Sequence, residues 1–354
     1  MGSANVQAVL NGQVPRWRVH SAIRIGIDLS PMKLTVKKEW PSIPSDSFLL
    51  QTASLQDGTL LALCLERGAA RAYSLLVIQP ENAQVQQHPL PHVSPPDRDD
   101  RPVLFASGMV WGCIVGGCRL FLHTGEGAES SLIRIDDPQR LYPPHAHLLN
   151  ASVLAAPGHP VYVSLERAPT YTGDARHFAE LRWSAGDASA HWSALSAVQP
   201  SADCPASPIG GYTPKLEGLM SARESDDLYA FIPGSDIGSP MKHGMRYWAL
   251  VRMTPRGEVV EVLLRGGNTS DGKRQGVNCV FTSTGDHAIL TPMFATDDWR
   301  GKQRLFSIAQ RTSEEVTLPR GKSKYRLIQQ SHSGFWIWRH DEGQISIALC
   351  QQAP

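Results

Sequence analysis

The stretch FLLQTASLQDGTLLALCL, residues 48–65, carries the clearest structural signal in this chain. Two apolar runs, Phe48–Ala53 and Thr59–Leu65, flank the tripeptide Gln56-Asp57-Gly58. Asp-Gly suits the positive φ angles of a type I′ turn, and two apolar runs joined by such a turn are typical of an antiparallel hairpin. The stretch therefore predicts two paired β-strands with a type I′ turn between them.

The same arrangement returns five times along the chain. The later turns are expected at Ser107-Gly108, Pro157-Gly158, Ser225-Asp226, Gly285-Asp286 and Ser333-Gly334. Counted from Asp57, successive turns are 50, 50, 69, 59 and 48 residues apart. A near-regular period of about 50 residues is a repeat signal in the range of propeller blades.

Each repeat carries a second pair of apolar runs, except the last, which shows only Gln344–Cys350 before the chain stops. The missing strand has two candidates near the other end of the chain, Ala22–Leu29 and Lys33–Trp40. Helical periodicity is nearly absent. The pattern resembles the six-bladed β-propeller architecture, all-β and closed by an N-terminal strand, because closure removes exposed sheet edges.

This reading predicts a single propeller domain over residues 1–354, with residues 1–17 as a flexible N-terminal segment. The rival interpretation is two β-sandwich domains split near residues 200–214. Two sandwiches would explain the strands but not their even spacing.

Composition narrows the classes of partner and compartment. With 34 Lys plus Arg against 33 Asp plus Glu, a net charge of +1 argues against binding nucleic acid or anionic membranes through bulk electrostatics. No apolar run reaches the length of a membrane span, and residues 1–8 lack the features of a secretory signal. We therefore expect a cytoplasmic protein.

Six cysteines are scattered along the chain, most of them in apolar stretches where Cys behaves as a small buried hydrophobe. Cys113 and Cys118 flank a Gly-Gly pair, so they could face each other across a hairpin as a disulfide or as part of a metal site. The sequence leaves open whether they pair.

Loop lengths distinguish the two ends of the expected ring. Connections between the first and second strands, and between the third and fourth, are short, as at residues 56–58 and 107–108. Connections at the other end are long: residues 89–102, 136–147, 167–177, 199–215, 233–245, 265–277 and 295–302. Long loops in compact domains are usually either functional or disordered, and because all of these fall at one end, this end is the candidate functional face.

The long loops combine aromatic residues with charges of both signs, the side chains that are enriched in protein hot spots. The predicted binding residues are Tyr171, Arg176, His177, Lys242, His243, Arg274, Asp297, Asp298, Trp299 and Arg300.

Catalytic, metal and cofactor motifs are weak. The chain has no Gly-x-Ser-x-Gly elbow, and its thirteen His have no recognisable Ser or Cys partner. The carboxylates at 97–100, the pair His145 and His147, and the glycine-rich run 265–274 fit solvated loops better than Ca²⁺, metal or phosphate sites. We therefore predict no catalytic residues, no metal and no cofactor.

These observations favour a non-catalytic binding platform that engages a protein partner through the loop-rich face. One concrete form of this hypothesis is a bacterial toxin-neutralising protein, that is, an immunity protein or inhibitor. The alternative is a propeller hydrolase acting on a glycoside or lactone with Asp or Glu near the central channel. The identity of the partner or substrate and the oligomeric state stay open.

Overall fold

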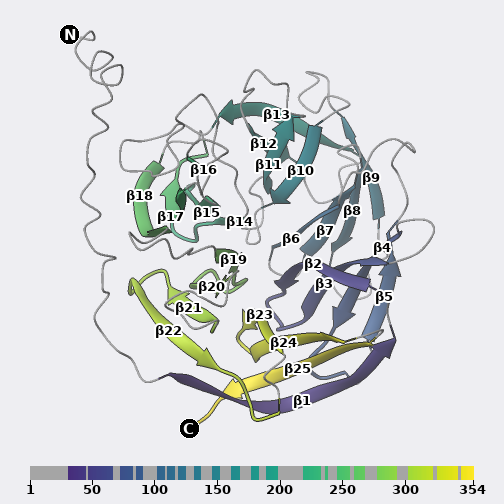
Figure 1. Ribbon diagram of the computed structural model, residues 1–354. Coiled ribbons are helices and arrows are strands. Elements are labelled where there is room, and N and C mark those ends of the chain that lie inside the picture. Colours follow the sequence, from purple (N-terminus) through teal and green to yellow (C-terminus); the bar gives the residue numbers. More distant parts are fainter. Residues whose placement is uncertain are drawn as a thin grey trace, which may run out of the picture.

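The computed structural model describes twenty segments of the chain. They are residues 31–44, 47–66, 72–82, 85–90, 102–107, 110–115, 119–124, 131–136, 146–151, 161–167, 177–182, 189–197, 218–232, 236–237, 245–255, 259–267, 277–292, 302–321, 325–341 and 344–354. These residues form β-strands joined by turns, and none of them is helical (Figure 1).

The strands fall into groups of consecutive antiparallel neighbours. Group 1 is β2 (Ser47–Ser54), β3 (Leu60–Glu66), β4 (Ala72–Ile78) and β5 (Val85–Pro89). Group 2 is β6 (Val103–Ser107), β7 (Val110–Val115), β8 (Arg119–Thr124) and β9 (Ser131–Asp136). Group 3 is β10 (Ala146–Ala151), β11 (Val161–Arg167), β12 (His177–Arg182) and β13 (Ser189–Ala197).

The second half of the chain repeats this pattern. Group 4 is β14 (Gly218–Ser221), β15 (Leu228–Ile232), β17 (Met245–Met253) and β18 (Val259–Gly267), with the short β16 (Asp236–Ile237) also paired to β17. Group 5 is β19 (Val277–Phe281), β20 (His287–Pro292), β21 (Arg304–Ser307) and β22 (Thr312–Thr317). Group 6 is β23 (Arg326–Ser331), β24 (Gly334–Asp341), β25 (Gln344–Gln352) and β1 (Met32–Pro44).

The groups are arranged around a central axis. Their first strands contact one another in the cyclic order β2, β6, β10, β14, β19, β23 and back to β2. The first strands lie nearest the axis, and the fourth strands β5, β9, β13, β18, β22 and β1 lie at the perimeter (Figure 1). The predicted all-β propeller is therefore confirmed. The count of six blades stays a prediction, and the strand groups formed by the described residues are compatible with it.

The ring closes through the N-terminal strand. β1 pairs antiparallel with β25 from Leu34 opposite Gln352 to Pro44 opposite Gln344, so the first described strand completes the last group. Of the two candidates in the sequence, Lys33–Trp40 is the one that closes the ring, while Ala22–Leu29 lies outside the described residues. Two separate β-sandwich domains are not formed, since β2 contacts β23 and a shared core joins group 1 to group 6.

Both faces of β3 are buried, because the strand lies between two neighbouring groups. Leu60, Ala62 and Cys64 of β3 pack against group 6. Leu61 and Leu63, on the opposite face of the same strand, pack against group 2. Because successive side chains of a strand point to opposite faces, a strand between two neighbours must be apolar at every position. This is the physical reason for the uninterrupted run that begins at Leu60.

Four interfaces between neighbouring groups, including the two on either side of β3, follow the same rule. Separate clusters of buried side chains lie between groups 6 and 1, 1 and 2, 4 and 5, and 5 and 6. A fifth cluster covers group 4 and includes Tyr162 of group 3 at its margin. Trp40 and Trp336, both buried, lie with ring centroids 5.1 Å apart in the cluster where the ring closes.

Two local expectations need correction. The turn after β2 is not type I′, because Gly58 has a φ of 91° while Asp57 does not have a positive φ. The Gly58 amide donates to the Leu55 carbonyl at 3.0 Å, which fits a type I turn followed by a left-handed glycine. The expected loop 233–245 is also interrupted, since β16 pairs with β17 inside it.

The single-domain boundaries, including the flexible segment 1–17, stay predictions, since residues 1–30 lie outside the described residues. The part of the chain that the structure describes contains no helix able to cross a membrane.

Candidate functional site

The direction of the strands gives the ring two distinct ends. The parallel pairs β9–β13 and β22–β1 show that neighbouring groups run in the same sense. One end, the short-turn end, carries the turns between first and second strands and between third and fourth strands. The other end, the long-segment end, carries the connections between second and third strands and from each group to the next.

The long stretches predicted to be functional attach to strands at the long-segment end. Most of their residues lie outside the described residues, which omit 91–101, 137–145, 168–176, 198–217, 238–244, 268–276 and 293–301. The strand ends that flank them are described, and these ends share one side of the ring. The predicted long stretches therefore attach at one end, although residues 152–160, between β10 and β11, connect strands at the short-turn end.

Nine of the ten predicted binding residues lie outside the described residues: Tyr171, Arg176, Lys242, His243, Arg274, Asp297, Asp298, Trp299 and Arg300. His177 is the first residue of β12, where its backbone pairs with Leu165 and Ala197. The ten-residue site therefore stays a prediction.

Three exposed side chains begin inner strands at the long-segment end, and we call them the axial mouth. Phe48 is the second residue of β2, Asn278 the second of β19, and Arg326 the first of β23. Phe48 is 38% exposed, one of three large hydrophobic side chains that are exposed among the described residues. Asn278 and Arg326 are exposed as well, although the strands that they begin are largely buried.

Hydrogen bonds between the inner strands show how the heights of the three residues along the axis compare. Thr52 Oγ1 donates to the Ile328 carbonyl at 3.0 Å and Ser54 Oγ to the Gln330 carbonyl at 3.4 Å, so β2 and β23 keep a constant offset of 276 residues. Arg326 is then level with residue 50, and Phe48 lies two residues, about 7 Å, closer to the end of the ring.

The same reasoning places Asn278 near the height of Arg326, on the neighbouring inner strand. The Gln329 side-chain amide contacts the Phe281 carbonyl and the Ser283 amide, so β23 and β19 lie side by side at that height. Stepping back three residues along both strands brings Arg326 level with residues 278–280. Sequence reasoning missed the axial mouth because it searched the long loops. Of its three residues, only Asn278 directly follows one of those loops, 265–277. β1 and β2 are separated by residues 45–46, and β22 and β23 by residues 318–325, so loop length gave no signal for Phe48 or Arg326.

A fixed side chain supports the backbone next to Arg326. Tyr325 is 4% exposed, and its hydroxyl donates to Glu39 Oε1 at 3.1 Å. The Arg339 guanidinium lies 5.5 Å from the centre of the Tyr325 ring, a cation–π distance. These contacts connect the start of β23 to β1 and β24.

The short-turn end is joined by direct contacts between its turns. Ser333 Oγ donates to the Asp57 carbonyl at 3.4 Å, and the Ser54 amide donates to Ser283 Oγ at 2.6 Å. Arg223 and Asp286, both about half exposed, form a 3.9 Å ion pair between the turns of groups 4 and 5. The described turns of groups 1, 4, 5 and 6 at this end are therefore tight and bonded to one another.

Side-chain amides bond the inner strands where no backbone ladder can form. Gln329 is fully buried, and its Oε1 accepts from the Ser283 amide at 3.0 Å and from the Gln330 amide at 3.1 Å. Its Nε2 donates to the Thr52 carbonyl at 3.4 Å and the Phe281 carbonyl at 3.3 Å. All four hydrogen-bonding positions of one amide thus join groups 1, 5 and 6.

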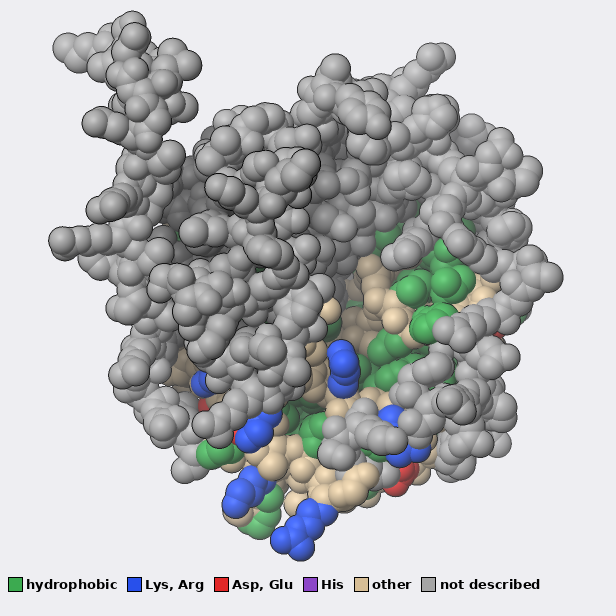
Figure 2. All heavy atoms as spheres, viewed as in Figure 1, with side chains coloured by type: hydrophobic (Ala, Val, Ile, Leu, Met, Phe, Trp, Pro, Cys, Tyr) green, Lys and Arg blue, Asp and Glu red, His purple; other side chains and the backbone are tan. Residues whose placement is uncertain are grey.

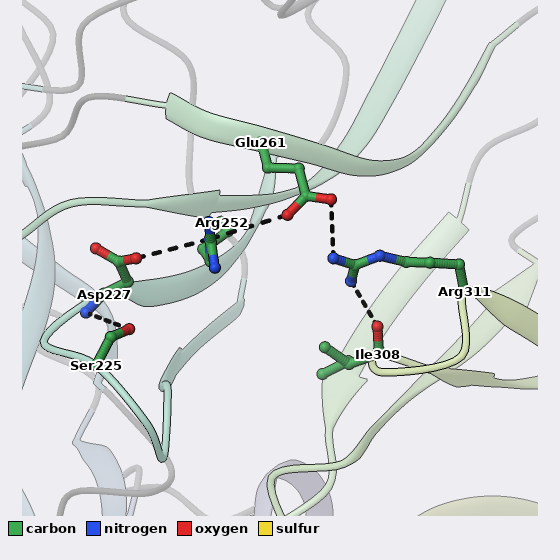
Figure 3. A network of polar contacts seen from close by, with 6 residues as sticks. All are labelled: Ser225, Asp227, Arg252, Glu261, Ile308 and Arg311. Atoms are coloured by element: carbon green, nitrogen blue, oxygen red, sulfur yellow. Dashed lines mark hydrogen bonds and ion pairs between the residues drawn. The ribbon is translucent and has the colours of Figure 1, made fainter.

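A charged network joins groups 4 and 5 near the perimeter (Figure 3). Arg252 Nε lies 3.6 Å from Asp227 and 3.9 Å from Glu261, and Arg311 reaches the other oxygen of Glu261 at 2.8 Å. Arg311, with φ of 57°, also donates to the Ile308 carbonyl of its own turn. The carboxylates here are paired with arginines, an arrangement that fastens neighbouring groups together.

The chemistry of the described residues does not assemble a metal centre. Within the described residues no three His, Cys, Asp or Glu side chains come together as a metal site. Residues 97–100 and His145 lie outside those residues, His147 belongs to β10, and of the run 265–274 only residues 265–267 are described, at the end of β18.

Titratable groups in the core are shifted by burial. Cys113 is a buried free thiol whose pKa burial raises, which disfavours the thiolate that a metal would need; Cys118 lies outside the described residues. Burial, with Glu66 adding to it, raises the pKa of Cys64 to about 12. Burial lowers the pKa of His287, although Asp286 and Glu314 oppose the shift.

Comparison with known proteins identifies no family. No family model matches the chain, and no curated protein matches it. Several solved structures resemble it in fold at 10–12% identity. YCF48 bound to D1 peptide shares 11% identity and covers 93% of this chain and 99% of its own, with a TM-score of 0.42.

Two other structures show a similar degree of likeness. The GH93 α-L-arabinofuranosidase of Fusarium graminearum, in complex with arabinobiose, shares 11% identity over 90% of this chain and 98% of its own, with a TM-score of 0.49. The N-terminal domain of Nup159 shares 10% identity over 92% and 97%, with a TM-score of 0.37. The set includes both a peptide-bound protein and a glycosidase, so these likenesses do not choose between the two functions.

Proposed function

We propose that this protein is a non-catalytic binding platform that engages a protein partner through the long-segment end of the ring. The observation that supports the proposal is the strand order, which gathers the attachment points of the long, mixed-charge segments at one end. The opposite end consists, where it is described, of short turns bonded to one another. Such an asymmetry suits a rigid scaffold that presents variable segments on one side.

The composition of these segments favours a protein as the partner. Asp297, Asp298 and Arg300 flank Trp299 in the sequence, and Tyr171 and Arg176 belong to another segment. Aromatic and Arg side chains dominate protein hot spots, and interspersed charges of both signs give specificity through complementary pairs. A uniform electrostatic field, which nucleic acid would require, is not expected from a net charge of +1.

A narrower form of the proposal is toxin neutralisation in a bacterial cytoplasm, in which the long segments cover the active site of a toxin. This form predicts that the partner is an enzyme and that binding abolishes its activity. An activity assay of the captured partner, with and without this protein, tests it directly.

Affinity purification from the source organism tests the general proposal. The variant Asp297→Lys, Asp298→Lys, Arg300→Glu reverses charges at the long-segment end, and Glu224→Lys, at an exposed position of the short-turn end, is the control. We expect wild type and control to retain one stoichiometric partner that the triple variant loses.

Two results would overturn the proposal. One is a partner that the triple variant retains and the control loses, because binding would then use the wrong end. The other is the absence of a stoichiometric partner together with turnover of aryl glycosides or lactones, which would establish the hydrolase alternative.

A further inference from the structure

The axial mouth is the described part of the long-segment end that has a definite chemistry. Phe48, Asn278 and Arg326 begin neighbouring inner strands, and all three are exposed. Arg326 and Asn278 are at a similar height, and Phe48 lies two residues, about 7 Å, closer to the end of the ring. Arg326 supplies a guanidinium with five donors, Asn278 supplies an amide, and Phe48 supplies an apolar surface. A cationic fork, an amide and an aromatic ring at the starts of neighbouring inner strands suit a peptide in which a carboxylate lies next to an apolar group.

The inner-strand starts contain no competing carboxylate. Their first two residues are Ser47-Phe48, Val103-Leu104, Ala146-His147, Gly218-Leu219, Val277-Asn278 and Arg326-Leu327. These pairs include an arginine and a histidine but neither Asp nor Glu. An anion at the described axial end would therefore meet donors without repulsion from these positions.

The wider surface agrees with this sign of charge. On the face seen in Figure 2, the described side chains include several Lys and Arg, while Asp and Glu occupy little of the described area. Lys302, Arg320 and Arg326 are exposed within groups 5 and 6, and Lys302 is paired with Glu315. The described surface of these groups thus offers cations to a ligand.

The position of Arg326 is held in advance of binding. Its neighbour Tyr325 is buried, is hydrogen-bonded to Glu39 and lies under the Arg339 guanidinium. The backbone from which Arg326 projects is therefore fixed, and binding would order only its side chain. Fixing a binding group in advance reduces the entropy lost on association.

From these observations we infer that the axial mouth binds an acidic peptide segment of the protein partner. Arg326 and Asn278 donate to a side-chain or terminal carboxylate of that segment, and Phe48 packs against an apolar residue next to it. This inference rests on the proposed function and specifies the chemistry of its partner.

A peptide probe tests the inference without knowledge of the partner. The probe is a fluorescein-labelled octapeptide, Glu-Glu-Phe-Glu-Glu-Phe-Glu-Glu, and its matched control replaces every Glu by Gln. Binding to wild type, Arg326→Gln and Arg223→Gln is measured by fluorescence anisotropy at fixed ionic strength. Arg223 is a half-exposed arginine at the short-turn end and serves as the control position.

We expect Arg326→Gln to weaken binding of the Glu peptide about tenfold, as the loss of one charge-assisted hydrogen bond implies. Arg223→Gln should change it less than twofold, and the Gln peptide should not distinguish wild type from Arg326→Gln. Phe48→Ser should weaken both peptides, because it removes the apolar contact. Equal affinities of the two arginine variants for the Glu peptide would overturn the inference. So would displacement of the peptide by tripolyphosphate at equal or lower concentration, which would indicate a phosphate ligand.

Affinity purification separates this inference from the proposed function. If the triple variant at 297–300 loses the partner and Arg326→Gln binds it as tightly as wild type does, the platform stands and the role of the axial mouth is wrong. If neither the wild type nor any variant captures a partner, the proposed function fails, whatever the result with the peptide.

Discussion

Replacing Gln329 by Met should show how much its side-chain amide, which joins neighbouring inner strands, contributes to the free energy of unfolding. Met has a similar length and adapts to its surroundings, so the substitution removes hydrogen bonds without opening a large cavity. It leaves four backbone groups of groups 1, 5 and 6 without their side-chain partner. The loss is therefore concentrated at a single buried amide.

The expected cost follows from the four distances. The contacts at 3.0 and 3.1 Å are ordinary hydrogen bonds, each contributing about 1 kcal/mol to the free energy of unfolding. The contacts at 3.4 and 3.3 Å are weaker, at about 0.5 kcal/mol each. The sum is about 3 kcal/mol, which lowers the urea midpoint by about 1 M if the denaturant slope is about 3 kcal/mol/M.

The neighbouring glutamine supplies a matched control. Gln330 Oε1 is buried and accepts no hydrogen bond among the described residues, so Gln330→Met removes no described bond of that oxygen. We expect Gln330→Met to change the free energy of unfolding by less than about 0.5 kcal/mol. Urea titration followed by tryptophan fluorescence measures both variants. Equal destabilisation by the two substitutions would refute the role assigned to the Gln329 amide.

Three further predictions concern the turns, the pH dependence and the closure of the ring. Gly58→Ala should lower the free energy of unfolding by about 2 kcal/mol or more, because the added Cβ would lie 2.1 Å from Ser333 Oγ at a φ of 91°. The control Gly321→Ala, at a φ of 75° with open space around it, should lower the melting temperature less. Because burial lowers the pKa of His287 in the folded state, the unfolded chain binds more protons below about pH 6.5, so stability falls as the pH drops through that value. His287→Asn should flatten this part of the profile of urea midpoint against pH. An unchanged slope would show that His287 does not cause the loss of stability. Lys38→Met should speed hydrogen exchange in β1, since Lys38 Nζ donates to the Pro80 and Asn82 carbonyls at 2.8 and 3.1 Å; unchanged exchange there would show that these bonds do not secure the strand.

The fold was largely predictable because its strongest constraint is local. Strands buried on both faces read as continuous apolar runs, and each tight turn between them needs residues such as Asp57-Gly58 or Ser333-Gly334. The turn type was predicted wrongly because Asp-Gly fits more than one hairpin turn, and the choice depends on the packing around Gly58. That packing involves Ser333, which is distant in sequence.

The site was harder to predict because it depends on the register between strands that share no backbone ladder. Phe48, Asn278 and Arg326 are widely separated in sequence, and their relative heights follow only from the side-chain bonds of Thr52 and Gln329. The long loops, by contrast, are evident from their length, but length does not reveal which of their residues meet.

Closure by β1 also has a consequence for the synthesis of the chain on the ribosome. Thr35 bonds to Gln351 across 316 residues, so β1 waits roughly 15 to 60 s for its partner strand at ordinary translation rates. During that interval it is an unpaired edge, and Lys33, Lys37 and Lys38 are the kind of charges that discourage pairing with other nascent chains. The carbonyls that accept hydrogen bonds from Lys38 belong to Pro80 and Asn82, which are synthesised early. β1 can therefore dock on group 1 long before group 6 is complete.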